Sequence, residues 1–379
     1  MTKVSGNCVD QFAAVRVAFE ENFESRGDIG ASVAVYRHGE CLVDLWGGRN
    51  GGIAVEPWEK DTLVNIWSTT KGVTAACIAM AVSRGFLDYR KRVVDYWPEF
   101  GAAGKDAVTV AMLLSHQAGL CGFRDATTLE DLYDVHRAAE RLAVSEPFWV
   151  PGEKSGYHAI TMGMLASELL RRAEGRTVAQ FVEDELRQGL GLDIFIGVPE
   201  AERWRVSDLE APPEMGSNDV GNDFTPAQIA ALTNPVFGPT VANSPEWRSA
   251  EIPSANGHAT ARSLAQLYCA LACDGQINGR AITDRRVIEQ ATRPQIEGVD
   301  AVLSIDARWG CGFLINSNGL YGPNQDSFGH SGWGGSFAFG DPSAGMGVAY
   351  TMNQMGTDLV GDPRNRALID AVYASVKLA

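Results

Sequence analysis

The stretch from Thr69 to about Arg84 is apolar on all sides when it is wound into a helix. Alanine, cysteine, isoleucine, methionine and valine fill positions 75–82, and Gly85 follows as a suitable helix end. A helix without a polar face needs protein around it on every side. The sequence therefore predicts a fold built around a buried helix, and 379 residues are enough to bury it.

The run Trp67-Ser68-Thr69-Thr70-Lys71 stands where this helix begins, and Lys71 is the only one of the seven lysines with a serine three residues before it. Side chains at that spacing share a helix face, so the Lys71 amine can reach the Ser68 oxygen. Burial lowers the pKa of an amine, and a helix N-terminus favours negative charge. These features predict a serine nucleophile with a lysine base. The alternative is a helix-capping Ser68 beside an incidental Lys71, although a lysine in an apolar helix is costly without a role.

Tyr157 lies in the segment 151–159, just ahead of a helical pattern. A tyrosine beside a serine–lysine pair can shuttle the serine proton, and its phenolate would be stabilised by the neighbouring ammonium. Without such a pair, Tyr157 would be interpreted as a packing residue.

The segment Gly329-His330-Ser331-Gly332-Trp333-Gly334-Gly335-Ser336 is rich in glycine. Glycines let a strand edge approach a ligand closely. A backbone N–H from this segment, together with that of the nucleophile, would form an oxyanion hole. A tight β-turn is the alternative for this segment taken alone.

The remaining pattern predicts an α+β fold, with an antiparallel sheet built from both chain ends, flanked by helices, and an inserted all-helical part. We expect one domain over 1–85 and 191–379 and a helical domain over 86–190. The predicted strands are 31–36, 42–46, 310–315, 336–339 and 347–352. The predicted helices are 9–27, 69–84, 108–114, 129–142, 159–172, 178–186, 258–273 and 364–376. Residues 208–256 form a long irregular stretch whose aromatic residues suggest a packed pocket wall.

Charge and composition exclude several classes of protein. The net charge of −15 argues against binding to nucleic acid or to an anionic membrane surface. The N-terminus carries no apolar signal-peptide core and no run is long enough to span a membrane, so a cytoplasmic protein is expected. The seven scattered cysteines should be reduced, and the six histidines show no metal-ligand spacing, so we predict no metal and no cofactor.

The three motifs, in this order, resemble those of the serine β-lactamase and penicillin-binding superfamily, and in particular the family VIII carboxylesterases. The likeness extends over most of the chain and includes the segments 112–120 and 256–262. It implies that Ser68 is the nucleophile, Lys71 the general base or proton shuttle, and Tyr157 its partner. It also implies an oxyanion hole formed by the backbone N–H groups of Ser68 and Trp333.

Two departures from the lactamase pattern narrow the expected substrate. His330, Ser331 and Gly332 stand where β-lactamases carry Lys-Thr-Gly, so the ammonium that binds a β-lactam carboxylate is missing. Ala159 stands where they carry an asparagine. We therefore expect a carboxylic ester hydrolase whose partner is a small-molecule ester. The alternatives are a β-lactamase, a D-amino-acid peptidase, an acyltransferase, or a non-catalytic ligand sensor.

Other conspicuous residues receive structural interpretations. We expect His116 to satisfy a buried turn and His158 to pack beside Tyr157. Asn256 and His258 should fix the loop that enters their helix. Trp333 is different, because a bulky side chain beside an oxyanion donor should limit the acyl pocket and favour short acyl chains.

Overall fold

The largest element of the computed structural model is a nine-stranded antiparallel sheet; the structure describes residues 2–52, 56–212, 224–358 and 361–376. The strand order is β1-β3-β2-β15-β14-β13-β12-β11-β10. The strands are β1 (Val4–Cys8), β2 (Gly30–Arg37), β3 (Glu40–Gly48), β10 (Ile296–Val299), β11 (Asp306–Trp309), β12 (Leu314–Ile315), β13 (Phe328–Ser331), β14 (Phe337–Asp341) and β15 (Met346–Met352).

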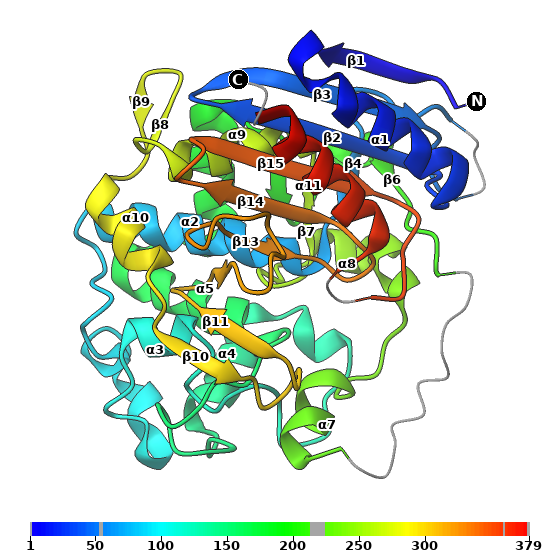
Figure 1. Ribbon diagram of the computed structural model, residues 1–379. Helices are drawn as coiled ribbons and strands as arrows, with labels where there is room; N and C mark the ends of the chain where they lie inside the picture. The colour runs from blue at the N-terminus through cyan, green and yellow to red at the C-terminus, as the bar shows by residue number, and fades with distance from the viewer. Residues whose placement is uncertain (1, 53–55, 213–223, 359–360, 377–379) are drawn as a thin grey trace.

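The two ends of the chain meet in the middle of this sheet. β2 pairs with β15 over its full length, with Ala34 opposite Ala349. α1 (Ala13–Ser25) and α11 (Pro363–Val376) lie together on one face, while α9 (Ala261–Ala272) and α2 (Thr70–Ser83) lie behind the sheet (Figure 1). The α+β class and the sheet shared by both chain ends are confirmed.

A small four-stranded sheet contains the strand that leads into α2. Its order is β5-β7-β4-β6, with β4 (Leu63–Asn65) beside β7 (Gly257–Ala259). β5 (Ile194–Ile196) and β6 (Val206–Ser207) are its edges. Because β4 ends two residues before Trp67, this sheet fixes where the nucleophile turn begins.

Helices dominate the middle of the chain and pack below α2 in Figure 1. They include α3 (Val110–Leu114), α4 (Val135–Val144), α5 (Thr161–Glu174) and α6 (Val178–Phe181), and α5 contacts α2 directly. From Thr70 to Ala81 every residue of α2 is buried, as the apolar pattern predicted. The division of the chain into two domains stays a prediction.

Several predicted boundaries are wrong for identifiable reasons. The helix expected over 258–273 begins at Ala261, because Thr260 accepts the Ser263 N–H as its cap and residues 257–259 form β7. The strand expected over 310–315 is only β12, because Gly310 and Gly312 make a turn instead. The helix expected over 9–27 is shorter, and strands β1, β10, β11 and β13 were not predicted.

The stretch 208–256 is more ordered than its composition suggested. It contains α7 (Pro226–Leu232) and α8 (Pro245–Ser249), both of which begin with a proline after a capping hydroxyl. Residues 213–223 of this stretch lie outside the described residues. Within the described ranges, no helix has both the length and the apolar character needed to cross a membrane.

Candidate active site

The nucleophile turn connects β4 to α2 through a short 3-10 segment, Trp67–Thr69. Trp67 adopts φ 45°, in the left-handed region that side chains seldom occupy. This conformation turns the chain sharply, so that Ser68 remains partly exposed while both of its neighbours are buried. α2 begins at Thr70, one residue after the predicted start at Thr69, and Ser68 stands just ahead of the N-terminus of α2.

Lys71 is completely buried, with its amine Nζ 3.0 Å from Ser68 Oγ. The same amine donates to two carbonyl oxygens, at 2.6 Å to Ala159 and at 3.0 Å to Ser254. Burial holds the pKa of Lys71 well below its usual value, as predicted. A neutral amine has two N–H donors and one lone pair. With both donors on carbonyls, the lone pair is left to face the Ser68 hydroxyl, which is the geometry of a general base.

Tyr157 completes the cluster from the other side, with its hydroxyl 2.7 Å from Ser68 Oγ. Its ring lies beside the amine, since Lys71 Nζ is 4.7 Å from the ring centroid. Burial raises the pKa of Tyr157 above its usual value, and the hydrogen bond with Ser68 only partly opposes this rise. The raised pKa favours the neutral phenol of Tyr157 over the phenolate. The role of Tyr157 as a proton shuttle stays a prediction.

Asp300 positions Tyr157 and was not identified from the sequence. This buried carboxylate accepts the backbone N–H of Tyr157 at 2.9 Å and the indole N–H of Trp309 at 3.1 Å. The Trp309 ring stacks on the Tyr157 ring, with centroids 5.7 Å apart. No local motif surrounds Asp300, and its isolation in an apolar segment was the only available signal.

β13 and the turn that follows it bring the glycine-rich segment against the nucleophile. Ser336 Oγ donates to the carbonyl of Ile66 at 2.9 Å and lies 3.1 Å from Thr69 Oγ1. A Cβ on Gly332 would stand 2.3 Å from the Ile66 oxygen, so only glycine allows this approach. In the described part of the chain, neither the Ser68 N–H nor the Trp333 N–H donates to a protein acceptor. The assignment of these two groups to an oxyanion hole stays a prediction.

His330 is a neutral side chain in the described site. Its Nδ1 donates to the Ser331 carbonyl at 2.8 Å, and burial, helped by Lys71, lowers its pKa to about 3. Ser331 itself makes a side-chain contact with Tyr321, at 3.3 Å between the two oxygens. His330 therefore cannot replace the lysine ammonium that a β-lactamase offers to a carboxylate.

Three aromatic rings surround the ring of Trp67, the residue before the nucleophile, and we call the four rings together the aromatic cluster. The Trp67 ring lies 5.1 Å from Trp333, 5.3 Å from Trp247 and 6.2 Å from Phe237 between centroids. Phe237 and Trp247 come from the stretch that was predicted to form a pocket wall. The cluster packs bulky side chains around Trp67, the residue directly before Ser68.

The remaining conspicuous residues hold the scaffold, as predicted. His158 accepts the Leu120 N–H at 3.1 Å and contacts the Gly156 carbonyl at 2.6 Å, so both of its ring nitrogens are occupied. His116 accepts the His158 N–H at 3.1 Å from a left-handed turn. Asn256 fixes the loop before β7, because its amide donates to two carbonyls and accepts the Ile252 N–H. His258 lies in β7 and contacts the Asn256 carbonyl at 2.8 Å.

Comparison with known proteins identifies relatives that are similar to this chain in sequence and structure. Residues 16–372 match the family model described as Beta-lactamase. The esterase/β-lactamase LipL of Mycobacterium tuberculosis is 35% identical, in an alignment that covers 94% of this chain and 85% of that protein. A solved family VIII carboxylesterase is 41% identical with a TM-score of 0.94, over 98% of this chain and 100% of that one. A penicillin-binding protein homolog from Caulobacter crescentus is 46% identical with a TM-score of 0.93, over 99% and 100% of the two chains.

Proposed function

The chain belongs to the β-lactamase family and, within it, to the family VIII carboxylesterases, and we propose that it cleaves short-chain carboxylic esters through an acyl-enzyme on Ser68. It is a serine carboxylesterase, in keeping with relatives that are named esterase and carboxylesterase. The observation that carries the catalytic assignment is the pair of hydrogen-bond contacts on Ser68 Oγ, one with Lys71 and one with Tyr157.

In the acylation step, Ser68 Oγ attacks the ester carbonyl carbon and its proton passes to Lys71 Nζ. The lowered pKa of Lys71 supports this assignment of the base, while the raised pKa of Tyr157 argues against a phenolate in that role. The N–H groups of Ser68 and Trp333 hold the negative charge that develops on the carbonyl oxygen.

The collapse of this intermediate breaks the bond to the alcohol oxygen. Tyr157 gives its proton to the departing oxygen, and the Lys71 ammonium restores the proton to Tyr157. Water then attacks the acyl-enzyme carbonyl, while Lys71 takes a proton from the water directly or through Tyr157. The Ser68 oxygen takes this proton from Lys71 as it leaves, so the carboxylic acid is released and the site returns to its starting state.

Esters fit this site better than β-lactams for an electrostatic reason. A β-lactam carries a carboxylate, and binding it in a buried site requires a cation beside it. His330 is neutral at physiological pH because its pKa is about 3. Ala159 also offers no side-chain amide. A neutral ester needs neither group.

The aromatic cluster supports the preference for short acyl chains. Trp333 lies within the glycine-rich segment and packs against Trp67, which precedes the nucleophile. An acyl group attached to Ser68 therefore meets rigid aromatic surfaces rather than an open channel. A long chain would have to displace these packed rings.

Substitution of the nucleophile tests the proposal. Ser68→Ala should lower the turnover of p-nitrophenyl acetate by at least about 10⁴-fold, because it removes the only atom that forms the acyl bond. A phosphonate ester should add its mass to the Ser68 peptide of the wild type. Ser343→Ala is the matched control, since Ser343 is exposed and its hydroxyl donates to Asp326. Wild-type turnover in Ser68→Ala would overturn the assignment.

A substrate panel separates the activities that this fold supports elsewhere. β-Lactamase activity is the second candidate, because the relative from Mycobacterium tuberculosis is named esterase/β-lactamase. We expect rapid turnover of acetyl and butyryl esters, and slow or no turnover of a cephalosporin and of a D-alanyl amide. An added alcohol would reveal acyl transfer, and silence towards all activated esters would favour a ligand sensor.

The proposal also covers the cellular compartment and the partner of the protein. All seven cysteines are free thiols, which supports the expectation of a reducing, cytoplasmic compartment. The expected partner is a small-molecule ester, with neither nucleic acid nor membrane.

A further inference from the structure

Arg364, in the first turn of α11, has a buried guanidinium whose five N–H donors all have acceptors. Nε and Nη2 donate to the two oxygens of Asp362, at 3.0 and 2.6 Å. Nη1 donates to Asp28 at 2.9 Å and to the Gln354 carbonyl at 2.7 Å. The fifth donor, on Nη2, reaches the Gly334 carbonyl at 2.8 Å. Because a guanidinium is planar and rigid, it fixes these acceptors relative to one another.

One end of this hydrogen-bond network is anchored in the centre of the nine-stranded sheet. Asp28 lies just ahead of β2, and its two oxygens each accept the Tyr350 hydroxyl at 2.7 Å. Tyr350 belongs to β15, which pairs with β2 along its full length. The Arg364 guanidinium is therefore held by the rigid middle of the fold.

The other end of the network is the turn that contains Trp333. Gly334 and Gly335, which follow it, have φ values of 87° and 123°, in the region that favours glycine. A Cβ on Gly335 would stand 2.8 Å from Arg364 Nη2, so the turn lies directly against the guanidinium. The Gly334 carbonyl also accepts the Gly356 N–H at 2.8 Å. These contacts fix the turn on the side that faces α11.

The opposite side of the same turn is fixed on the segment that leads into the nucleophile. The Gly332 N–H donates to the Ser336 carbonyl at 2.7 Å, and the Ser336 hydroxyl donates to the Ile66 carbonyl at 2.9 Å. Trp333 thus lies between two points that are held independently. An oxyanion donor is effective only when it is held about 2.7–3.1 Å from the developing charge. The position of the Trp333 N–H therefore depends on both attachments.

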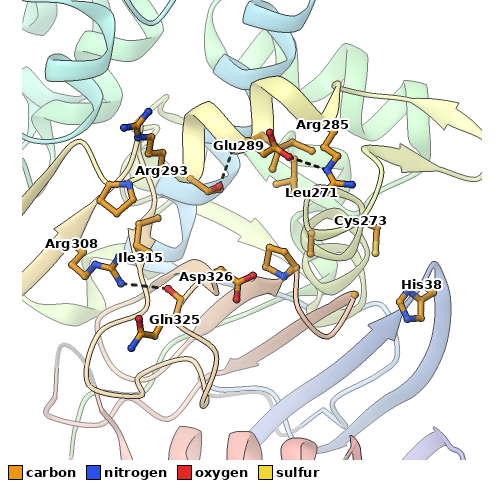
Figure 2. A pocket seen from close by; sticks show the side chains of 16 residues that line it. His38, Leu271, Cys273, Arg285, Glu289, Arg293, Arg308, Ile315, Gln325 and Asp326 are labelled. Carbon is orange, nitrogen blue, oxygen red and sulfur yellow. Dashed lines mark hydrogen bonds and ion pairs between the residues drawn. The ribbon is translucent and has the colours of Figure 1, made fainter.

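An ion pair elsewhere in the molecule shows how an exposed arginine differs from Arg364. The cavity in Figure 2, about 660 Å³ in volume, lies against α10 (Arg285–Thr292), and Arg285 pairs there with Glu289 at 3.0 Å. These two side chains are 81% and 64% exposed, whereas that of Arg364 is 4% exposed. The lining of this cavity includes neither Ser68 nor the segment 329–336. An exposed pair of this kind contributes little to the order of its surroundings.

We propose that Arg364 is a positioning residue for catalysis, which holds the Trp333 N–H in the oxyanion hole through the Gly334 carbonyl. The proposal rests on the proposed function, because it requires that the Trp333 N–H binds the oxyanion. Arg364 acts through the turn, since all five of its donors are occupied by the protein. Its effect therefore falls on the binding of the transition state and leaves the binding of the ester unchanged.

Arg364→Lys tests the proposal and keeps a cation beside the two carboxylates. An ammonium cannot match the five acceptors of the guanidinium, so the contact with Gly334 is lost. The kcat for p-nitrophenyl acetate should fall about tenfold with KM within about twofold, because a displaced donor costs less than a deleted one. The affinity for propylboronic acid, whose adduct with Ser68 is tetrahedral, should fall by the same factor as kcat/KM.

The matched control is Arg366→Lys, because Arg366 is an exposed arginine of the same helix that donates to the Gly319 carbonyl at 3.2 Å. It should keep the wild-type kcat, KM and boronate affinity. Titration with a p-nitrophenyl phosphonate counts the reactive chains in each preparation. A merely structural role of Arg364 would lower this count and leave kcat per titrated site unchanged. That result, or a wild-type boronate affinity in Arg364→Lys, would overturn the proposal.

Tyr350→Phe gives a second test that keeps Arg364 in place and applies even if Arg364→Lys does not fold. It removes the hydroxyl that holds Asp28, so kcat per titrated site should fall about threefold. Tyr373→Phe is its control, because the Tyr373 hydroxyl donates to a different buried carboxylate, that of Asp341. Equal kcat per site in these two variants would overturn the proposal.

Ser68→Ala separates this proposal from the proposed hydrolase activity. If Ser68→Ala loses turnover and boronate binding while Arg364→Lys keeps both at the wild-type level, only the positioning role of Arg364 fails. If Ser68→Ala keeps its turnover, the proposed function itself fails.

Discussion

Two buried cations in this molecule have opposite surroundings. Lys71 lies at the nucleophile with only carbonyl and hydroxyl oxygens around its amine. Arg364, at the start of α11, donates to the carboxylates of Asp28 and Asp362 at 2.9 and 2.6 Å. Burial lowers the pKa of both cations, but the acidic neighbours of Arg364 raise its pKa overall. A buried cation with counter-charges holds structure, while one without them becomes a base.

The largest expected effect is the loss of activity when the unpaired amine is removed. Lys71→Met should lower kcat/KM for p-nitrophenyl acetate by at least about 10⁴-fold, because no other group can take the Ser68 proton. Its free energy of unfolding should equal or exceed that of the wild type, because the lowered pKa of Lys71 means that burying its amine costs stability, and a buried methionine carries no such cost. Activity assays and urea unfolding measure the two outcomes.

A large decrease in the free energy of unfolding of Lys71→Met would contradict the contrast drawn between Lys71 and Arg364. It would show that the Lys71 amine stabilises the fold as the Arg364 guanidinium does. Met is the appropriate replacement, since it fills a similar volume without a charge.

The complementary substitution is Arg364→Met. It should destabilise the protein by about 3–5 kcal/mol, because two buried carboxylates lose their partner. The guanidinium also donates to the Gly334 carbonyl at 2.8 Å, next to Trp333, so a smaller loss of kcat is expected through the turn. Denaturant unfolding gives the first value and steady-state kinetics gives the second. An unchanged unfolding free energy would contradict the structural role of Arg364.

The sequence allowed the reacting groups to be predicted but not what surrounds them. Ser68 and Lys71 could be predicted because their side chains carry the chemistry and their spacing is local, whereas Tyr157, 89 residues from Ser68, became a candidate only beside that pair. The two carbonyls that hold the Lys71 amine belong to the backbone, which leaves no signature in residue type. The protonation state of Tyr157 could not be predicted from the sequence, because it depends on burial and on the charge of a neighbour.

The fold shows the same difference between local patterns, which could be predicted, and contacts between distant segments, which could not. The alternating and apolar runs of β2 and β15 predicted the centre of the sheet. β13 was missed because its four residues include Gly329 and His330, which give no strand pattern. Its place in the sheet comes from pairing with β14, a contact between segments that the local pattern does not encode.

The pH dependence of activity sharpens the contrast between the two cations. Lys71 must be neutral to act, so kcat/KM should fall about tenfold for each pH unit below its lowered pKa. The raised pKa of Tyr157 should keep the profile flat well into the alkaline range. Since the unfolded chain binds a proton at Lys71 that the native state lacks, the free energy of unfolding should rise as pH approaches 10.5. A profile that is flat from acid to neutral pH would contradict the role of Lys71 as the base.

Substitution of Lys105 should have the smallest effect, and it serves as the control for the removal of a buried lysine. Its amine is covered and donates to the Ala102 and Ser145 carbonyls at 2.5 Å each, and burial lowers its pKa as it does for Lys71. No serine hydroxyl is among its contacts in the described residues. Ala102 is exposed and Ser145 partly so, and water can replace the amine there. Lys105→Met should therefore change stability by less than about 1 kcal/mol and leave kcat/KM unaltered. A loss of activity as large as that expected for Lys71→Met would show that removing a buried lysine held by carbonyls is enough to lower activity. The contact of Lys71 with Ser68 would then no longer explain the effect of Lys71→Met.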